Sequence, residues 1–109
     1  MTNIILPNSL IYLGKDTFGE CYNLASITLS NQTVSIGGSM FYLCMALDNL
    51  YIPNTVNYIG YGIFNSCSRL STVHYDGTIA EWNAIDLDPN WDYGHDNYII
   101  YCTDGNIQK

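Results

Sequence analysis

The chain has 109 residues, of which 48% are hydrophobic and 12% are charged, so we expect one folded domain with a modest core and exclude a disordered protein. The formal charge of −7 includes only three basic residues, which argues against partners such as nucleic acid or an anionic membrane surface. Apolar runs are far shorter than the roughly 20 residues that cross a bilayer, and the start MTNIILPNSL lacks the pattern of a signal peptide. We therefore expect no membrane insertion, and localisation stays open among the cell surface, the cytoplasm and a virion.

Similar residues return every 23 positions through residues 1–75. The columns include Ile4, Ile27, Leu50 and Val73; Leu13, Ile36 and Ile59; Gly14, Gly37 and Gly60; Phe18, Phe41 and Phe64; Cys21, Cys44 and Cys67; and Leu24, Leu47 and Leu70. A fixed period across so many positions is typical of a solenoid, in which each repeat packs only on its neighbours. The pattern predicts three repeats over residues 1–75 and a non-repeating C-terminal segment over residues 76–109.

Each repeat has the pattern of one coil, made of a short strand, a turn and an arc. The segments IIL, ITL, LYI and VHY have apolar or aromatic outer residues around a variable one, which is the pattern of a strand with one buried face. The glycine column follows a buried aliphatic residue, where the chain turns and a Cβ would obstruct it. The Phe, Cys and Leu columns are three residues apart, a spacing that keeps one face inward in a helical or 3₁₀ segment. We therefore expect parallel strands joined by short helical arcs, with the phenylalanines in the core.

The cysteines form a column along the predicted stack. Because Cys21, Cys44 and Cys67 are each one coil apart, they cannot surround a tetrahedral metal ion. Neighbouring thiols lie near disulfide range, but a row of three cannot pair completely, and a buried free cysteine behaves as a small hydrophobic residue. We expect reduced core thiols here and at Cys102, with a disulfide or a metal site as the alternatives.

Residues 76–109 begin with a helix signal and end with a strand signal. Thr78 and Glu81 have the spacing of a capping box, in which each side chain bonds a backbone N–H at a helix start. This predicts a helix over residues 79–86, with Trp82 pressed on the open end of the last coil. After a polar loop, NYIIYC has the composition of a strand, and the DG pair that follows has that of a hairpin turn. We expect the segment to act as a C-terminal cap, because the terminal core of a solenoid would otherwise face water.

The loop DLDPNWDYGHD has oxygen-bearing side chains at alternate positions. They belong to Asp86, Asp88, Asn90 and Asp92. The alternation is similar to that of calcium loops, but an EF-hand requires Gly at its sixth position and Glu at its twelfth, where this chain has Trp91 and Asn97. A solvated acidic loop is the favoured interpretation, and a calcium site is the alternative.

The sequence contains no arrangement of residues that indicates catalysis. His74 lies at the variable middle position of a strand, and His95 lies in the acidic loop. Neither accompanies a nucleophile in a G-x-S-x-G turn or metal ligands with H-E-x-x-H spacing. We therefore expect a protein that is not an enzyme and needs no cofactor, with His74 as an exposed residue of a sheet.

The repeat units resemble the BspA-like leucine-rich repeats, whose pattern is similar to IP-x-S-V-x-x-IG-x-x-A-F-x-x-C-x-x-L-x-x-I. LPNSLIYLGKDTFGECYNLASI and IPNTVNYIGYGIFNSCSRLSTV match it closely, whereas the middle unit lacks the Pro, and Thr17, Met40 and Ile63 replace the Ala before Phe. YDGTIAEWNAI is similar to the closing motif of the family, Y-x-G-T-x-x-E-W-x-x-I. The resemblance implies an α/β repeat solenoid: a leucine-rich-repeat-like, right-handed stack of short parallel strands with short helical arcs and a C-terminal cap.

A leucine-rich solenoid offers a sheet surface whose outward residues are free to vary, and this predicts a non-catalytic protein-interaction module. The outward candidates are Thr28, Tyr51 and His74, with Tyr12 and Tyr58 in a second column. Tyrosine supplies contact area with few torsions to restrict, so these tyrosines are candidate binding residues. The alternative interpretation is that they simply tile the half-buried outside of a sheet.

The sequence is also compatible with two other functions, and it predicts a contact at the N-terminal end of the stack. The resemblance associates the chain with bacterial surfaces and with host or matrix contact, so one alternative is a carbohydrate-binding or adhesion role in which Trp91 is a stacking platform. A Trp91 side chain packed into the C-terminal cap is the competing interpretation of this residue. The other is a structural role in a virion or surface assembly. Because no lid precedes the first strand at Ile4 and Leu6, we expect that end to meet upstream repeats or a second copy of the chain.

Overall fold

The computed structural model describes residues 2–5, 12–14, 19–94 and 98–108, and of residues 2–5 and 12–13 it describes the backbone alone. The strands and the helix in these ranges are β1 (Thr2–Ile5), β2 (Tyr12–Leu13), β3 (Leu24–Thr28), β4 (Ser35–Ile36), β5 (Asn49–Pro53), β6 (Tyr58–Ile59), β7 (Thr72–Asp76), α1 (Ile79–Asn83), β8 (Asp86–Leu87), β9 (Ile99–Cys102) and β10 (Gly105–Gln108).

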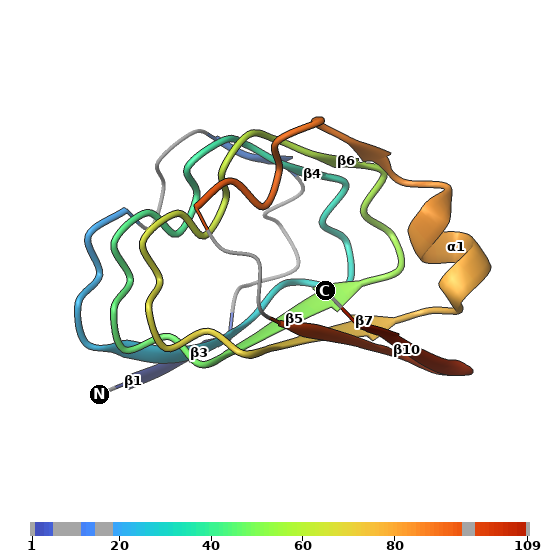
Figure 1. The fold of residues 1–109 in the computed structure, drawn as a ribbon. Helices are drawn as coiled ribbons and strands as arrows, with labels where there is room; N and C mark the ends of the chain where they lie inside the picture. The colour runs from blue at the N-terminus through green and yellow to red at the C-terminus, as the bar shows by residue number, and fades with distance from the viewer. Residues whose placement is uncertain (1, 6–11, 15–18, 95–97, 109) are drawn as a thin grey trace.

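The strands form two sheets on opposite sides of a solenoid (Figure 1). The large sheet has the strand order β1-β3-β5-β7-β9-β10, and the small sheet has the order β2-β4-β6-β8. Strands of the two sheets alternate along the chain as far as β9, so the backbone winds from one sheet to the other and back. The described neighbouring pairs are parallel except for β9 and β10, which are antiparallel. The predicted stack of parallel strands is therefore confirmed.

Neighbouring strands pair in the 23-residue register. In the large sheet Ile27, Leu50 and Val73 are direct partners, and all three are fully buried. In the small sheet Ile36 pairs with Ile59, and both of these side chains are also buried. The repeat columns therefore face the interior between the two sheets, so the period reflects packing.

The arcs that lead from the small sheet back to the large sheet are hydrogen-bonded turns, which corrects the predicted helical arcs. Residues 39–43 and 61–66 are turns in which left-handed backbone conformations recur one repeat apart. The left-handed residues are Ser39, Gly62, Leu43 and Ser66, with φ values of 55°, 55°, 60° and 66°. A left-handed residue interrupts a right-handed helix. The turn amides bond to the next coil instead, as from the Phe41 nitrogen to the Ile63 carbonyl oxygen at 2.6 Å.

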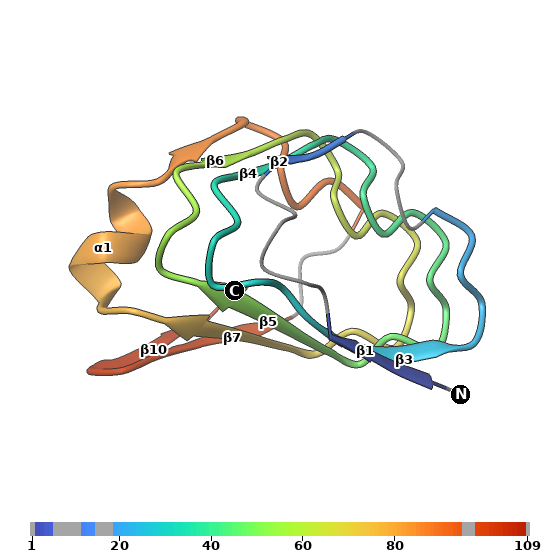
Figure 2. The same cartoon turned by 180° about the vertical axis from the view of Figure 1, so that it is seen from behind.

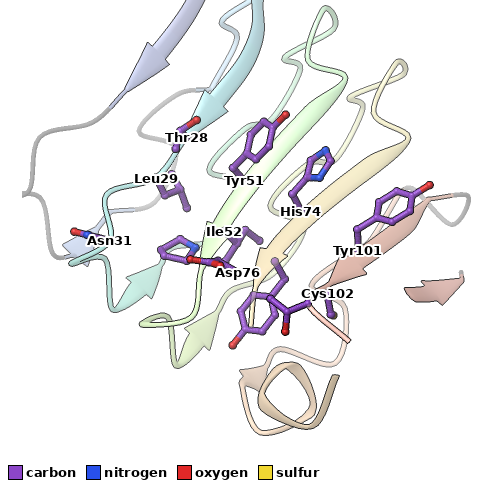
Figure 3. Close-up of a pocket in the computed structure, with 12 residues that line it drawn as sticks. Thr28, Leu29, Asn31, Tyr51, Ile52, His74, Asp76, Tyr101 and Cys102 are labelled. Carbon is purple, nitrogen blue, oxygen red and sulfur yellow. The ribbon is translucent and has the colours of Figure 1, made fainter. Parts of the chain in front are cut away.

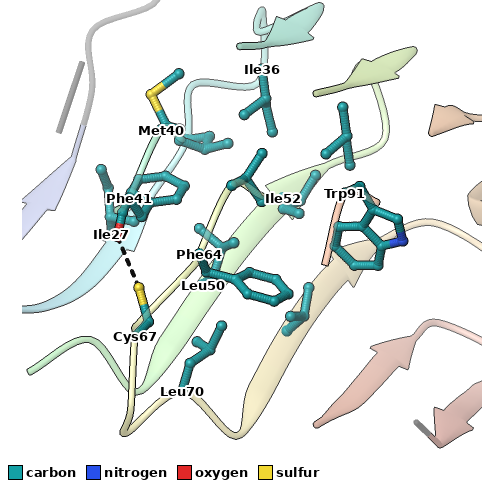
Figure 4. Packing of buried hydrophobic residues seen from close by; sticks show 14 of the residues in the cluster. Ile27, Ile36, Met40, Phe41, Leu50, Ile52, Phe64, Cys67, Leu70 and Trp91 are labelled. Atoms are coloured by element: carbon teal, nitrogen blue, oxygen red, sulfur yellow. Dashed lines mark hydrogen bonds between the residues drawn. The ribbon is translucent and has the colours of Figure 1, made fainter. Parts of the chain in front are cut away.

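The inward face of these arcs is nevertheless the one that the spacing predicts. Phe41 and Phe64 are fully buried, whereas Phe18 lies outside the described residues. Met40, which stands where the family pattern has Ala, is also fully buried. Figure 4 shows these side chains filling the space between the strands, with Trp91 beside Phe64.

Close approach of neighbouring coils explains the glycine at position 60 of the glycine column. A Cβ added at Gly60 would lie 2.7 Å from the backbone nitrogen of Gly38, far inside the normal contact distance. The amide of Gly60 also bonds the Ile36 carbonyl oxygen at 2.9 Å, which holds the two coils together at this point. Glycine is thus needed at this position for the packing of one coil on the next.

All four cysteines are free, and they are buried to different degrees. Cys44 and Cys67 are buried, whereas Cys21 and Cys102 are half-buried. The thiol of Cys67 donates a hydrogen bond to the Phe41 carbonyl oxygen at 2.9 Å (Figure 4). Contact with the Cys44 thiol, together with burial, raises the pKa of Cys67, so this thiol stays protonated near neutral pH.

The segment after β7 adds β8 to the small sheet and β9 and β10 to the large sheet. Helix α1 begins at the predicted capping box: the Glu81 amide donates to the Thr78 hydroxyl oxygen at 3.1 Å, and the Thr78 amide donates to the Glu81 carboxylate at 2.9 Å. The helix ends at Asn83, earlier than predicted, because β8 pairs with β6 soon afterwards. Strand β9 pairs with β7, and β10 turns back along β9. The division of the chain at residue 75 and the closing role of this segment stay predictions.

Aromatic rings fill the core next to α1. Trp82 is 3% exposed and meets Tyr75 and Trp91 edge-on, with ring centroids 5.2 and 5.4 Å apart. Trp91 in turn meets Tyr98, whose hydroxyl donates to the Asp92 carboxylate at 2.6 Å. Figure 2 shows α1 at one end of the solenoid, where it spans from the large sheet to the small one.

Candidate binding surface

The outer face of the large sheet carries a row of side chains at one register position. Thr28, Tyr51, His74 and Tyr101 are direct partners on β3, β5, β7 and β9. Because side chains alternate along a strand, these residues point away from the core that their buried neighbours form. Tyr51 and Tyr101 are each 39% exposed, and Thr28 and His74 are half-buried (Figure 3).

Three of these side chains stack into what we call the aromatic ladder: Tyr51, His74 and Tyr101. The Tyr51 and His74 rings are 4.3 Å apart between centroids and 7° from parallel, and the His74 and Tyr101 rings are 5.8 Å apart and 22° from parallel. Both faces of the His74 ring therefore meet a neighbouring ring, whereas Tyr51 and Tyr101 each turn one face toward His74. Stacking of this kind restricts the side chains before any partner arrives.

A hydrogen bond and partial burial set the state of His74 in the centre of the ladder. Its Nε2 lies 3.0 Å from the side-chain oxygen of Asn49, which assigns the Nε2–H tautomer to the imidazole because an amide oxygen accepts. Burial lowers the pKa of His74, so the ring is neutral at physiological pH. The ladder is thus an uncharged surface.

A groove of about 500 Å³ lies beside the ladder, at the carboxyl ends of β3, β5, β7 and β9. Its lining includes the apolar residues Leu29, Ile52 and Pro53 and the rings of the ladder. Among the described residues that line it, Asp76 is the only acidic one and none is a lysine or an arginine. The groove is therefore mostly apolar, with one carboxylate.

The second predicted column lies elsewhere on the molecule. Tyr12, Ser35 and Tyr58 pair in register in the small sheet, and Tyr58 is 38% exposed. The small sheet is on the other side of the solenoid from the large one (Figures 1 and 2). The structure thus separates Tyr58 from Tyr51, and it does not describe the side chain of Tyr12.

The structure excludes the stacking platform that is one interpretation of Trp91. Its side chain is only 6% exposed, and it packs edge-on against Phe64, Trp82 and Tyr98. A ring that stacks on a sugar needs an open face, which Trp91 does not have. It belongs to the core and not to a binding surface.

The residues of the predicted calcium loop make other contacts. The Asp88 carboxylate accepts a hydrogen bond from the backbone N–H of Asn90 at 2.9 Å, and the Asp92 carboxylate accepts one from the Tyr98 hydroxyl. Asp86 lies on β8 in the small sheet. Among the side chains described, at residue 14 and over 19–94 and 98–108, no three His, Cys, Asp or Glu residues gather in a way that could hold a metal ion. The described part of the chain therefore gives the calcium alternative no support.

Two residues of the binding surface are missing from the sequence predictions. Tyr101 follows His74 by 27 residues, because α1 lengthens this coil, so a search at the 23-residue period does not find it. Asp76 lies one position beyond the predicted strand VHY, and only the pairing of β5 with β7 shows that it lies opposite Pro53. Tyr101 could have been found from the strand segment NYIIYC, because side chains alternate between the two faces of a strand. With Ile100 facing inward, Tyr101 faces outward.

Two sheets whose strands as far as β7 pair in parallel and advance in 23-residue steps, with aliphatic columns between them, define the class of this protein as a leucine-rich-repeat solenoid. The sequence profile of the BspA type leucine rich repeat region matches residues 1–84 in six copies. The chain belongs to this BspA-type leucine-rich-repeat family, which confirms the predicted family.

One solved structure to which the chain is similar is the crystal structure of a leucine rich cell surface protein from Faecalibacterium prausnitzii A2-165. The two sequences are 21% identical and the TM-score is 0.40. The match covers 79% of this chain and 35% of that protein. No curated protein matches the chain. Within the described residues, no helix has the length and apolar character that crossing a membrane requires.

Proposed function

We propose that the chain is a non-catalytic protein-interaction module that binds its partner through the outer face of the large sheet. The observation that carries this proposal is the stacked ladder of Tyr51, His74 and Tyr101 beside a groove of about 500 Å³. The family supports a binding role, because leucine-rich solenoids present extended sheet surfaces whose outward residues vary independently of the core.

The surface has the properties of a protein-binding site. Tyrosine contributes a large contact area and a hydroxyl group, and stacking has already restricted the torsions of Tyr51 and Tyr101. The large sheet is five strand spacings of about 4.8 Å wide, or roughly 24 Å, which is enough for an interface of ordinary size. Binding hot spots are often rigid aromatic side chains near the centre of such a face.

A carbohydrate-binding role has less support. A sugar stacks on an open ring face, whereas the faces of His74 are covered by Tyr51 and Tyr101, and Trp91 is buried. The resemblance to BspA-like proteins supports a place at a bacterial surface or in a larger assembly, and we include that place in the proposal. The end of the stack formed by β1 is proposed to meet further repeats or a second copy of the chain.

The test compares the two faces of the solenoid. Random short peptides displayed on phage are selected against the wild-type protein, and their affinities are measured for Tyr51→Ala and Tyr101→Ala, with Tyr58→Ala as the matched control on the small sheet. We expect each ladder variant to weaken binding at least about tenfold and the control to change it less than about twofold. Selected peptides that bind both ladder variants as tightly as the wild type would refute the proposal. Binding on a glycan array that is lost in Tyr51→Ala, with no peptide selected, would establish the carbohydrate alternative in its place.

A further inference from the structure

We propose that the groove of the large sheet binds an extended basic segment of a partner protein, with an arginine or lysine side chain paired with the Asp76 carboxylate. The inference rests on the proposed function and adds the chemistry of the partner.

The shape of the groove fits a short extended chain. It crosses the carboxyl ends of four neighbouring strands, so it is three strand spacings of about 4.8 Å, or roughly 14 Å, in length. An extended chain rises about 3.3 Å per residue, so about four residues fit along it. The exposed rings of Tyr51 and Tyr101 provide contact for side chains (Figure 3), and the exposed Asn31 and Thr103 provide polar groups for the backbone of the segment.

The charge of the groove selects a cation. Asp76 is exposed, and its carboxylate has no hydrogen-bond or ion-pair partner among the described residues. Two further carboxylates lie nearby but bond to the start of α1: Glu81 accepts from the Thr78 amide, and Asp104 accepts from the Ile79 amide at 2.9 Å. Asp76 is therefore the carboxylate left for a ligand.

The neighbouring charges strengthen this preference. Burial and the negative charges of Glu81 and Asp76 raise the pKa of the Tyr75 hydroxyl, and burial and the charge of Asp104 raise the pKa of the Cys102 thiol. Tyr75 and Cys102 both line the groove, so its end near Asp76 has a negative potential. A guanidinium group would form paired hydrogen bonds with the Asp76 carboxylate and pack its flat face along the apolar lining.

A basic partner fits better than a second copy of the chain. Each copy has a formal charge of −7 and only three basic residues, so two copies repel each other at long range. A basic segment is attracted to the whole molecule as well as to Asp76. We therefore expect association to weaken as sodium chloride is added, because salt screens these charges.

The experiment uses the peptides selected on phage, synthesised with a fluorescent label and measured by anisotropy. The Asp76→Asn variant removes the groove charge, and Asp86→Asn removes one exposed charge from the small sheet as the matched control. We expect the selected peptides to be enriched in arginine or lysine, Asp76→Asn to weaken binding at least about tenfold, and Asp86→Asn to change it less than about twofold. Replacing the basic residue of a selected peptide by glutamine should weaken binding about as much as Asp76→Asn does. Combining the two changes should weaken binding little more than either change alone.

The outcomes separate this inference from the proposed function. Peptides without basic residues, whose binding is lost in Tyr51→Ala but not in Asp76→Asn, would overturn the inference and leave the proposed function standing. Binding that neither variant affects would overturn both. A wild-type protein that doubles its mass in light scattering, and returns to the monomer mass in Asp76→Asn, would show a second copy as the occupant and overturn the basic partner.

Discussion

The aromatic core next to α1 allows a quantitative test with Trp82→Ala. The Trp82 side chain is 3% exposed and makes edge contacts with Tyr75 and Trp91. A buried tryptophan removes about 200 Å² from water, which at about 25 cal/mol per Å² corresponds to roughly 5 kcal/mol. Alanine keeps part of that burial, while the cavity that remains and the lost ring contacts add to the cost. We expect the variant to lower the free energy of unfolding by about 3–5 kcal/mol.

The assay is thermal unfolding followed by circular dichroism. For a domain of about this size each kcal/mol lowers the Tm by roughly 4 °C, so the expected shift is about 12–20 °C. Tyr22→Ala is the matched control, because the Tyr22 side chain is 53% exposed, and its Tm should move by less than about 3 °C. A shift for Trp82→Ala as small as that of the control would show that Trp82 does not close the core, and the reasoning about this end of the solenoid would fail.

Two further predictions concern groups that titrate or react. In the native protein Cys21 and Cys102 should react with a thiol reagent much faster than Cys44 and Cys67, and all four should react after unfolding; fewer than four thiols in the unfolded protein would reveal a disulfide. Because burial lowers the pKa of His74 below its ordinary value of 6.5, the unfolded state takes up this proton first, so stability should fall as the pH drops through 6.5. Urea unfolding at a series of pH values checks this, and His74→Gln should flatten the decline; equal slopes for the two proteins would contradict the assigned state of the imidazole.

The strands could be predicted because their signal is periodic. The columns that contain Ile27, Leu50 and Val73 follow from the 23-residue spacing, and the parallel register of the large sheet follows from the columns. The outward positions of Tyr51 and His74 then follow from alternation. Each of these inferences needs only the sequence and the geometry of a strand.

The arcs and the last coil could not be predicted in the same way. Ser39 and Leu43 adopt left-handed conformations that their residue types do not indicate, because the amide bonds to the next coil impose them. Helix α1 ends at Asn83 because the chain then enters β8, which is fixed by a tertiary contact, its pairing with β6. The burial of Trp91 likewise depends on rings from distant segments, which a polar loop sequence does not reveal.

The direction of the hydrogen bonds between coils has a mechanical consequence. Strands β1 and β10 form the two edges of the large sheet, and the bonds between strands run across the sheet from one edge to the other. Tension applied between these edges would act along the hydrogen bonds between strands, so neighbouring coils would separate one after another. Tension applied along the strands would load many bonds together in shear and meet much greater resistance. A tether attached through the ends of the stack would therefore lengthen stepwise under load.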